Sequence, residues 1–234
     1  MIKLIKKLIG FIILLLLLGL LLFVGKGYLE YKEVTDEAAI ETKVNDLRNK
    51  SNYTVLSDIN INMQNAQIAI EDKRFYKHGA IDIIGTVRAL VVNIKSESLA
   101  QGGSTITQQL AKNFYFMDDN NGTKKIAEAF VAHKLESLYS KEEILEMYLN
   151  IVYYGDNNYG IYEASINYFN TKPQDLSIAQ SSMLAGLVQA PSVYALSNHD
   201  NRTYIRQRQV LKAMLDQDYI NQNEYDAALN ETVY

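Results

Sequence analysis

The 234-residue chain has no cysteine, no tryptophan and only two prolines, Pro173 and Pro191. The lack of cysteine excludes disulfides, zinc–thiolate sites and catalytic thiols. The scarcity of proline, beside many Leu, Ile, Glu and Lys residues, favours a helical protein. A chain of this length has room for one ordinary domain and an anchor. These absences predict a mainly helical protein without thiol chemistry.

Charge is nearly absent from the first part of the chain, where the only charged side chains before Glu30 are Lys3, Lys6, Lys7 and Lys26. The whole chain has 23 basic and 27 acidic side chains, so the part that follows these lysines is acidic. An acidic body argues against a nucleic-acid-binding protein, because phosphate backbones attract basic surfaces.

An uncharged apolar run extends from Leu8 to Val24. As a helix of about 18 residues it extends roughly 27 Å, which just spans the hydrocarbon core of a bilayer. The residues from Gly25 to Leu29 fit a signal-peptidase site poorly, so we interpret the run as an uncleaved signal anchor rather than a cleaved signal peptide. The positive-inside rule places the N-terminus in the cytoplasm and the rest of the chain outside.

Three parts are therefore expected. They are a cytoplasmic tip with a transmembrane signal anchor over residues 1–27, a stalk or first helix over 28–52, and a globular domain over 53–234. Loose alternation from Tyr53 to Asn60 is compatible with a short strand. The predicted class is mainly α, with at most a small β element.

Capping patterns predict where several helices begin. Ser140 with Glu143 is a capping box, Ser177 precedes an apolar run, and Asn221 with Glu224 resembles a further box. In each case a side-chain oxygen can accept a hydrogen bond from an otherwise unpaired N–H group in the first helical turn.

An acid, several bases, two aromatic residues and a histidine are crowded between Glu71 and Gly79. A carboxylate at the end of an apolar helix is partly desolvated, which raises its pKa toward that of a general base. Lys73 and Arg74 oppose that rise but can hold a phosphate. A charged helix end with a glycine stop explains the same residues, so both interpretations stay open. His78 fits an orienting hydrogen-bond partner, and the three histidines have no metal-ligand spacing.

Two glycines, Gly102 and Gly103, lead into hydroxyl and amide side chains. Ser104 or Thr105 is expected to cap a helix, whose N-terminal N–H groups and positive dipole end suit a phosphate. Glutamine amides suit sugar hydroxyls, and Lys112 suits a diphosphate. The segment is not a P-loop, because no Gly-Lys-Ser/Thr follows at the required spacing. A capped helix with a polar face is the simpler alternative.

Lys124, Lys125 and Glu128 form a third charged group. Lys124 and Glu128 are four residues apart and fit an exposed ion pair on a helix. The alternative is that Glu128 is a second active-site carboxylate, with the lysines near the same anion. The residues alone favour the exposed pair.

Five segments, taken in order, resemble the glycosyltransferase domain of family 51, which occurs in class A penicillin-binding proteins and monofunctional peptidoglycan glycosyltransferases. The segments are Glu71–Gly79, Gly103–Gln109, Lys124–Glu128, Tyr148–Asn150 and Ala185–Leu187. The second is highly specific, and the resemblance covers about Asn60 to Tyr194. Because no transpeptidase domain follows before Tyr234, the chain resembles the monofunctional type.

The resemblance implies a lysozyme-like, two-lobed helical domain, preceded by a single transmembrane helix. One lobe would be partly sunk in the membrane, and Ile81 to Ile94 is apolar enough to be that segment. It also implies a peptidoglycan glycosyltransferase on the outer side of the bacterial cell membrane. Its expected partners are lipid II, the growing lipid-linked glycan, the cytoplasmic membrane, and proteins of cell-wall synthesis or division.

By the same resemblance, Glu71 is a general base that takes the proton from the 4-hydroxyl of the acceptor lipid II, and Glu128 is a second catalytic carboxylate. The acceptor oxygen attacks the donor's anomeric carbon with inversion, and undecaprenyl diphosphate leaves. Mg²⁺ or Mn²⁺ is an expected cofactor, with Glu128 as a ligand. The implied substrate-binding residues are Arg74, Phe75, His78, Arg88, Ser104, Thr107, Gln108, Gln109, Lys112 and Lys125.

Two departures from the family pattern would weaken donor binding. An acidic turn from Asp118 to Gly122 replaces an expected arginine, and Lys124 stands where an arginine usually begins the third motif. Lysine lacks the bidentate fork of arginine. Two alternative functions stay open at this point: a lysozyme-like enzyme that cleaves glycan, and an inactive membrane-tethered scaffold for cell-wall proteins.

Overall fold

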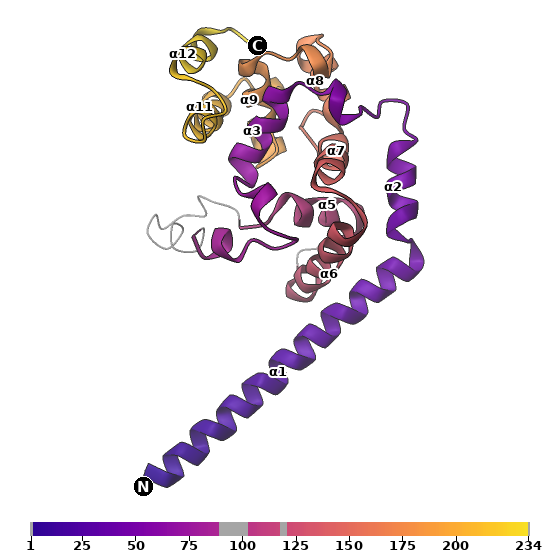
Figure 1. The fold of residues 1–234 in the computed structure, drawn as a ribbon, viewed down its shortest axis with the longest axis vertical. Coiled ribbons are helices and arrows are strands. Elements are labelled where there is room, and N and C mark those ends of the chain that lie inside the picture. The colour runs from indigo at the N-terminus through magenta and orange to yellow at the C-terminus, as the bar shows by residue number, and fades with distance from the viewer. Residues whose placement is uncertain (1, 89–102, 118–120, 234) are drawn as a thin grey trace.

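The computed structural model describes residues 2–88, 103–117 and 121–233, and nearly all regular structure in them is helical (Figure 1). The helices are α1 (Ile2–Glu37), α2 (Ile40–Arg48), α3 (Ile61–Glu71), α5 (Ile106–Tyr115), α6 (Gly122–Leu138), α7 (Lys141–Ile151), α8 (Ile161–Phe169), α9 (Ile178–Leu187), α10 (Pro191–Tyr194), α11 (Asn201–Leu215) and α12 (Gln222–Asn230). Four 3-10 turns are η1 (Leu56–Asp58), η2 (Phe75–Lys77), η3 (Pro173–Asp175) and η4 (Leu196–Asn198). Residues 83–88 are also helical. The mainly α class is confirmed.

The short strand expected between Tyr53 and Asn60 is not formed, and the 3-10 turn η1 lies there instead. The backbone N–H of Thr54 donates to Asn150 Oδ1 (2.8 Å), and the N–H of Leu56 donates to Glu146 Oε2 (2.8 Å). The strand prediction was wrong because side chains of α7 satisfy backbone groups that a neighbouring strand would otherwise have paired.

The three predicted helix caps are confirmed, and each forms a capping box. Ser140, Ser177 and Asn221 each accept a hydrogen bond from the N–H group three residues later, and the side chain of that residue bonds back to the cap. In each box both hydrogen-bonding residues lie within four positions of each other, so the pattern can be predicted from the sequence without the tertiary structure.

Helix α1 leaves the body of the protein as a long rod with the N-terminus at its free end (Figure 1). Among the described residues it is the one helix long and apolar enough to cross a membrane, with a mean hydropathy of 3.1 in a window of which 0 % is buried. This supports a membrane anchor. The helix runs past the expected boundary at Gly27 and ends at Glu37.

The end of α1 packs against the start of α6. A Cβ atom on Gly27 would lie 2.5 Å from the Cβ of Ile126, so the two helices approach closely only because this residue is glycine. Glu30, three residues after Gly27 on α1, accepts a hydrogen bond at its Oε1 from the Thr123 hydroxyl of α6 (2.7 Å). The anchor is thereby joined to the helix turn that carries Lys125.

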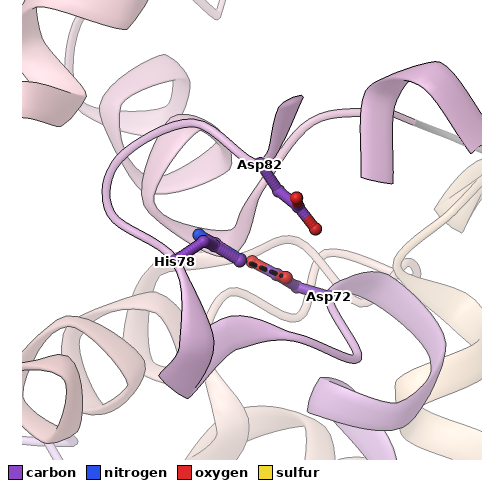
Figure 2. Close-up of side chains that lie close together, drawn as sticks. All are labelled: Asp72, His78 and Asp82. Atoms are coloured by element: carbon purple, nitrogen blue, oxygen red, sulfur yellow. Dashed lines mark hydrogen bonds and ion pairs between the residues drawn. The ribbon is translucent and has the colours of Figure 1, made fainter. Parts of the chain in front are cut away.

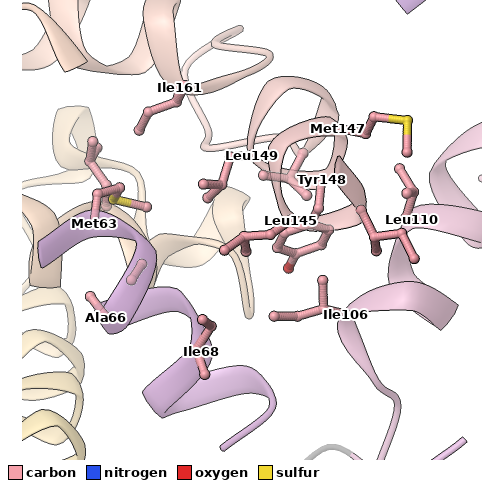
Figure 3. Close-up of a cluster of buried hydrophobic side chains, with 14 of the residues drawn as sticks. Met63, Ala66, Ile68, Ile106, Leu110, Leu145, Met147, Tyr148, Leu149 and Ile161 are labelled. Carbon is pink, nitrogen blue, oxygen red and sulfur yellow. The ribbon is translucent and has the colours of Figure 1, made fainter. Parts of the chain in front are cut away.

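The core brings together helices that are distant in sequence. Helix α3 packs against α9 and α11, and α5 packs against α6 and α7. Figure 3 shows buried side chains of α3, α5, α7 and α8 meeting around Tyr148 of α7, which is 0 % exposed. This packing places the end of α3 beside α5, and α5 beside α6, where the predicted site residues lie.

The segment expected to dip into the membrane, Ile81 to Ile94, is described only up to residue 88. In that part Ile83 and Ile84 are 73 % and 59 % exposed. Neighbouring exposed apolar side chains fit a membrane contact, which stays a prediction.

Candidate active site

Glu71 is the last residue of α3, and the chain leaves the helix at Asp72. Its Oε2 accepts a hydrogen bond from Gln109 Nε2 (2.7 Å), and its Oε1 lies 3.7 Å from the Arg206 guanidinium. Burial raises the pKa of Glu71, and although the bond from Gln109 and the charge of Arg206 act in the opposite direction, the net shift is upward. Glu71 is therefore a carboxylate with an increased affinity for a proton.

Asp72 ties the end of α3 to the start of α5. Its Oδ1 contacts His78 Nε2 at 2.7 Å, an interaction drawn as a dashed line in Figure 2. Its Oδ2 accepts a hydrogen bond from the N–H of Ile106 (3.1 Å). Ile106 is the first residue of α5, where an N–H group has no partner within the helix. The other ring nitrogen of His78 lies 2.5 Å from the Gly79 carbonyl oxygen. His78 thus orients Asp72, in agreement with its interpretation as a hydrogen-bond partner.

Arg74 is held by Asp82 across the following turn. Its Nε donates to Asp82 Oδ2 (3.1 Å), and a Cβ atom on Gly85 would lie 2.5 Å from the same oxygen. Burial alone would raise the pKa of Asp82, but hydrogen bonds from the Gly85 N–H and from Arg74 lower it overall. Asp82 therefore stays ionised and fixes the guanidinium beside the end of α3.

A small polar pocket of about 30 Å³ opens beside Glu71. That volume holds a water molecule or a single substrate group rather than a whole sugar. Arg88 lines it, and its Nε is buried without a hydrogen-bond partner in the part of the chain that the structure describes. The lining residues are Glu71, Asp72, Lys73, Asp82, Gly85, Arg88, Gly103, Ser104 and Thr105. Two cations thus share a pocket with the candidate base.

The start of α5 is formed by a capping box in which Thr105 is the cap and Gln108 the third helical residue. Thr107 is 0 % exposed and its hydroxyl donates to Glu136 (2.6 Å). Gln109 points toward Glu71, and its Oε1 accepts a hydrogen bond from the Tyr148 hydroxyl (2.8 Å). Of these polar side chains, Gln109 is the one that directly contacts the candidate base.

Glu128 lies on α6 and is 4 % exposed. It forms an ion pair with Lys125, whose Nζ also donates to Ser104 Oγ (2.8 Å). Burial raises the pKa of Glu128, and Lys125 together with the charge of Lys112 offsets part of the rise. Glu128 is therefore a buried carboxylate, not a member of an exposed surface pair with Lys124, and it holds an ammonium group in place.

The two glutamates are connected through α5 and the residues before it. Ser104 lines the pocket beside Glu71 and also binds Lys125, the partner of Glu128. One turn of α5 separates Gln109, which binds Glu71, from Lys112, whose charge acts on Glu128. The structure thus brings the first three predicted motifs into one site.

Arg206 is a site residue that the sequence analysis missed. It lies on α11, beyond the region of the five motifs, and is 8 % exposed. The available signal is its position on the buried face of α11, four residues before Val210. A charged residue on an apolar face indicates a buried partner, which here is Glu71.

Comparison with known proteins identifies the family of this chain. The transglycosylase family model matches residues 37–215. A monofunctional glycosyltransferase of Staphylococcus epidermidis is 40 % identical over 198 residues, which cover 80 % of this chain and 73 % of that protein. The chain belongs to the transglycosylase family. This confirms the resemblance drawn from the five motifs.

Longer members of the transglycosylase family also match. Penicillin-binding protein 1A of Neisseria lactamica is 44 % identical over 182 residues, which cover 78 % of this chain and 23 % of that protein. The chain thus spans about a quarter of the length of these relatives. A 2.6 Å crystal structure of penicillin-binding protein 1A from Haemophilus influenzae is 30 % identical, with a TM-score of 0.39 over 55 % of this chain and 16 % of that chain.

Some predicted substrate-binding residues are engaged within the protein. Phe75 is 0 % exposed, and the Lys141 ammonium lies 4.4 Å from the centre of its ring. Thr107 is fully buried, and Gln108 is bound in the capping box of α5. This gives them packing and capping roles, and their contact with substrate stays a prediction. The acidic turn from Asp118 to Gly122 lies mostly outside the described residues.

The residues near Glu128 favour an anion over a metal ion. The groups that act on its carboxylate are the ammonium groups of Lys125 and Lys112. The one group of potential metal ligands among the described residues is Asp72, His78 and Asp82, whose ligand atoms lie within 4.8 Å of one another. There Asp72 is bound to His78, and Asp82 to an arginine. The expected Mg²⁺ or Mn²⁺ stays a prediction.

Proposed function

We propose that this transglycosylase is a peptidoglycan glycosyltransferase that polymerises lipid II into β-1,4-linked glycan strands. The observation that carries the proposal is the environment of Glu71, a largely buried carboxylate with a raised pKa beside a neutral amide and a pocket lined by cations. A base of this kind serves proton transfer from a hydroxyl. The cations suit a diphosphate.

In the proposed step, Glu71 accepts the proton of the acceptor's 4-hydroxyl while that oxygen forms a bond to the anomeric carbon of the donor. The bond between that carbon and the diphosphate oxygen breaks, and the electron pair leaves with undecaprenyl diphosphate. One carboxylate acting as base gives inversion, with no covalent intermediate on the enzyme. The proton on Glu71 is afterwards released to water.

The leaving diphosphate needs charge stabilisation rather than a strong acid. Lys125, held by Glu128 and Ser104, and Lys112 on α5 supply fixed positive charge at one end of the site. Arg88 supplies it from the pocket beside Glu71. In this proposal Glu128 acts by orienting Lys125 toward the diphosphate, and it does not transfer the proton.

The proposed location is the outer face of the bacterial cell membrane, with the N-terminus in the cytoplasm. The lack of native cysteine offers a direct test. Lys3→Cys and Ser51→Cys each introduce a single thiol, at an exposed position before or after the apolar run. A membrane-impermeant maleimide should label intact cells that carry the Ser51 variant and leave those with the Lys3 variant unlabelled. The reverse pattern would contradict this topology.

The function is tested by incubating the detergent-solubilised full chain with labelled lipid II and separating the products by size. Glycan polymer should form, and Glu71→Gln should slow its formation about 10³-fold. Hydrolysis of finished peptidoglycan without growth on lipid II would favour the lysozyme-like alternative. Equal activity in the parent and the Glu71 variant would remove the proposed base, and the absence of both activities would favour the scaffold.

A further inference from the structure

Tyr148 has a buried hydroxyl that is connected to the proposed base, Glu71, through one intervening side chain. It lies on α7, is 0 % exposed, and donates a hydrogen bond to Gln109 Oε1 (2.8 Å). The other end of the same amide, Gln109 Nε2, donates to Glu71 Oε2 (2.7 Å). Three side chains from α7, α5 and α3 therefore form one directed series of hydrogen bonds that ends on Glu71.

The direction of this series depends on the orientation of the Gln109 amide. A carboxylate only accepts hydrogen bonds, so it must face the NH₂ end of the amide. Rotating the amide by half a turn would place its carbonyl oxygen against Glu71, and two acceptors would repel each other. The Tyr148 hydroxyl, placed at the carbonyl end as a donor, favours the orientation that stabilises ionised Glu71.

The hydroxyl is suited to this task because it keeps its proton. Burial, with the nearby negative charge of Glu71, raises the pKa of Tyr148 well above the ordinary value of a phenol. It therefore stays a protonated, neutral donor at neutral pH. Tyr148 itself is fully buried, and its hydrogen bond to Gln109 links it to Glu71.

We propose that Tyr148 is a positioning residue for glycosyl transfer, whose hydroxyl orients the Gln109 amide and thereby holds Glu71 ionised and in place to accept the proton of the acceptor hydroxyl. This inference rests on the proposed function for its kinetic consequence, and on the hydrogen bonds alone for its effect on Glu71. The competing explanation is that the ring of Tyr148 simply fills the core, where Figure 3 shows it surrounded by apolar side chains.

A matched control separates these two explanations. Tyr154 is also 0 % exposed, and its hydroxyl has no hydrogen-bond partner in the residues that the structure describes. Tyr148→Phe and Tyr154→Phe each remove one buried hydroxyl and keep the ring. The Tyr148 variant should lower kcat on lipid II about tenfold, change KM less than twofold, and move the acid limb of the pH profile upward. The Tyr154 variant should match the parent, and a Tyr148 variant that also matches it would overturn the proposal.

Gln109→Met provides a second test, because methionine has a similar shape and no amide. If Tyr148 acts through Gln109, then adding Tyr148→Phe to Gln109→Met should lower kcat less than twofold further. Two independent losses that multiply in the double variant would show that Tyr148 acts by another route.

A readout without substrate separates this proposal from the proposed function. The difference in Tm between the parent and Glu71→Gln, followed against pH, reports the titration of Glu71. Tyr148→Phe should move that titration to higher pH, and Tyr154→Phe should leave it unchanged. A parent that fails to polymerise lipid II would contradict the proposed function, while an unmoved titration in Tyr148→Phe would contradict the positioning role.

Discussion

Two largely buried glutamates lie in one site, but their partners differ in kind. Glu71 accepts a hydrogen bond from the neutral amide of Gln109, and its ion pair with Arg206 is long, at 3.7 Å. Glu128 is paired directly with the ammonium of Lys125. Burial raises the pKa of both carboxyls. The difference in partners, more than the difference in burial, therefore separates their chemistry.

An amide donor orients a carboxylate without neutralising it, whereas an ammonium at contact distance cancels its charge. Glu71 thus keeps the ability to take up a proton from a substrate hydroxyl. Glu128 is committed to Lys125 and serves by placing positive charge. Two similar residues in the same site thus take distinct roles because their partners differ.

The largest expected effect comes from Glu71→Gln. Because the variant keeps the shape of the side chain and loses the base, kcat on lipid II should fall about 10³-fold while KM changes less than twofold. Steady-state polymerisation kinetics measure both values. Residual activity above about a tenth of the parent would assign the base to another residue and end the distinction drawn here.

A smaller effect is expected on the other side of the site. Lys125→Met should lower kcat/KM about tenfold, since one charge at the diphosphate is lost. It also leaves Glu128 buried without its cation, so Tm should fall. Adding Glu128→Gln to this variant should restore Tm without restoring activity, because the unpaired charge is removed while the lost cation is not replaced. Recovery of activity in the double variant would contradict the role given to Lys125.

The pH dependence of the rate sharpens the assignment of the base. Glu71 works ionised, so log kcat should rise with pH through its pKa, which lies above the ordinary 4.5 of a glutamate. Arg206→Gln should move this limb to higher pH, because the guanidinium opposes the rise. Lys125→Met should leave the limb in place. If the acid limb instead moves in Lys125→Met and stays in place in Arg206→Gln, the general base would be Glu128.

The smallest expected effect is on stability. A carboxyl whose folded pKa is raised stabilises the fold at low pH, and this contribution is lost as the pH rises through the folded pKa. Glu71→Gln resembles the protonated form, so at neutral pH it should be more stable than the parent by roughly 1 kcal/mol, or about 2–4 °C in Tm. The difference should vanish in acid. A variant that is less stable at neutral pH would mean that the attraction of Arg206 exceeds the effect of burial.

The predicted features that the structure bears out are those encoded locally. The capping boxes at Ser140, Ser177 and Asn221 satisfy backbone groups within four residues, so the sequence contains both partners. The apolar run of α1 likewise needs only its own composition to be recognised. The segment from Tyr53 to Asn60 shows the opposite case, because its backbone partners come from α7, about ninety positions away.

The sequence by itself determined the helical class, the apolar N-terminal run and the helix starts, because these follow from composition, period and short motifs. The candidate residues Glu71 and Glu128 came from the resemblance of five ordered motifs to a known family. Only the tertiary structure decided what those residues touch. The packing of α3 against α11 brought Arg206 to Glu71, and the packing of α5 against α7 placed Tyr148 behind Gln109. Contacts between distant segments depend on the packed core as a whole, and no local pattern in the chain specifies them.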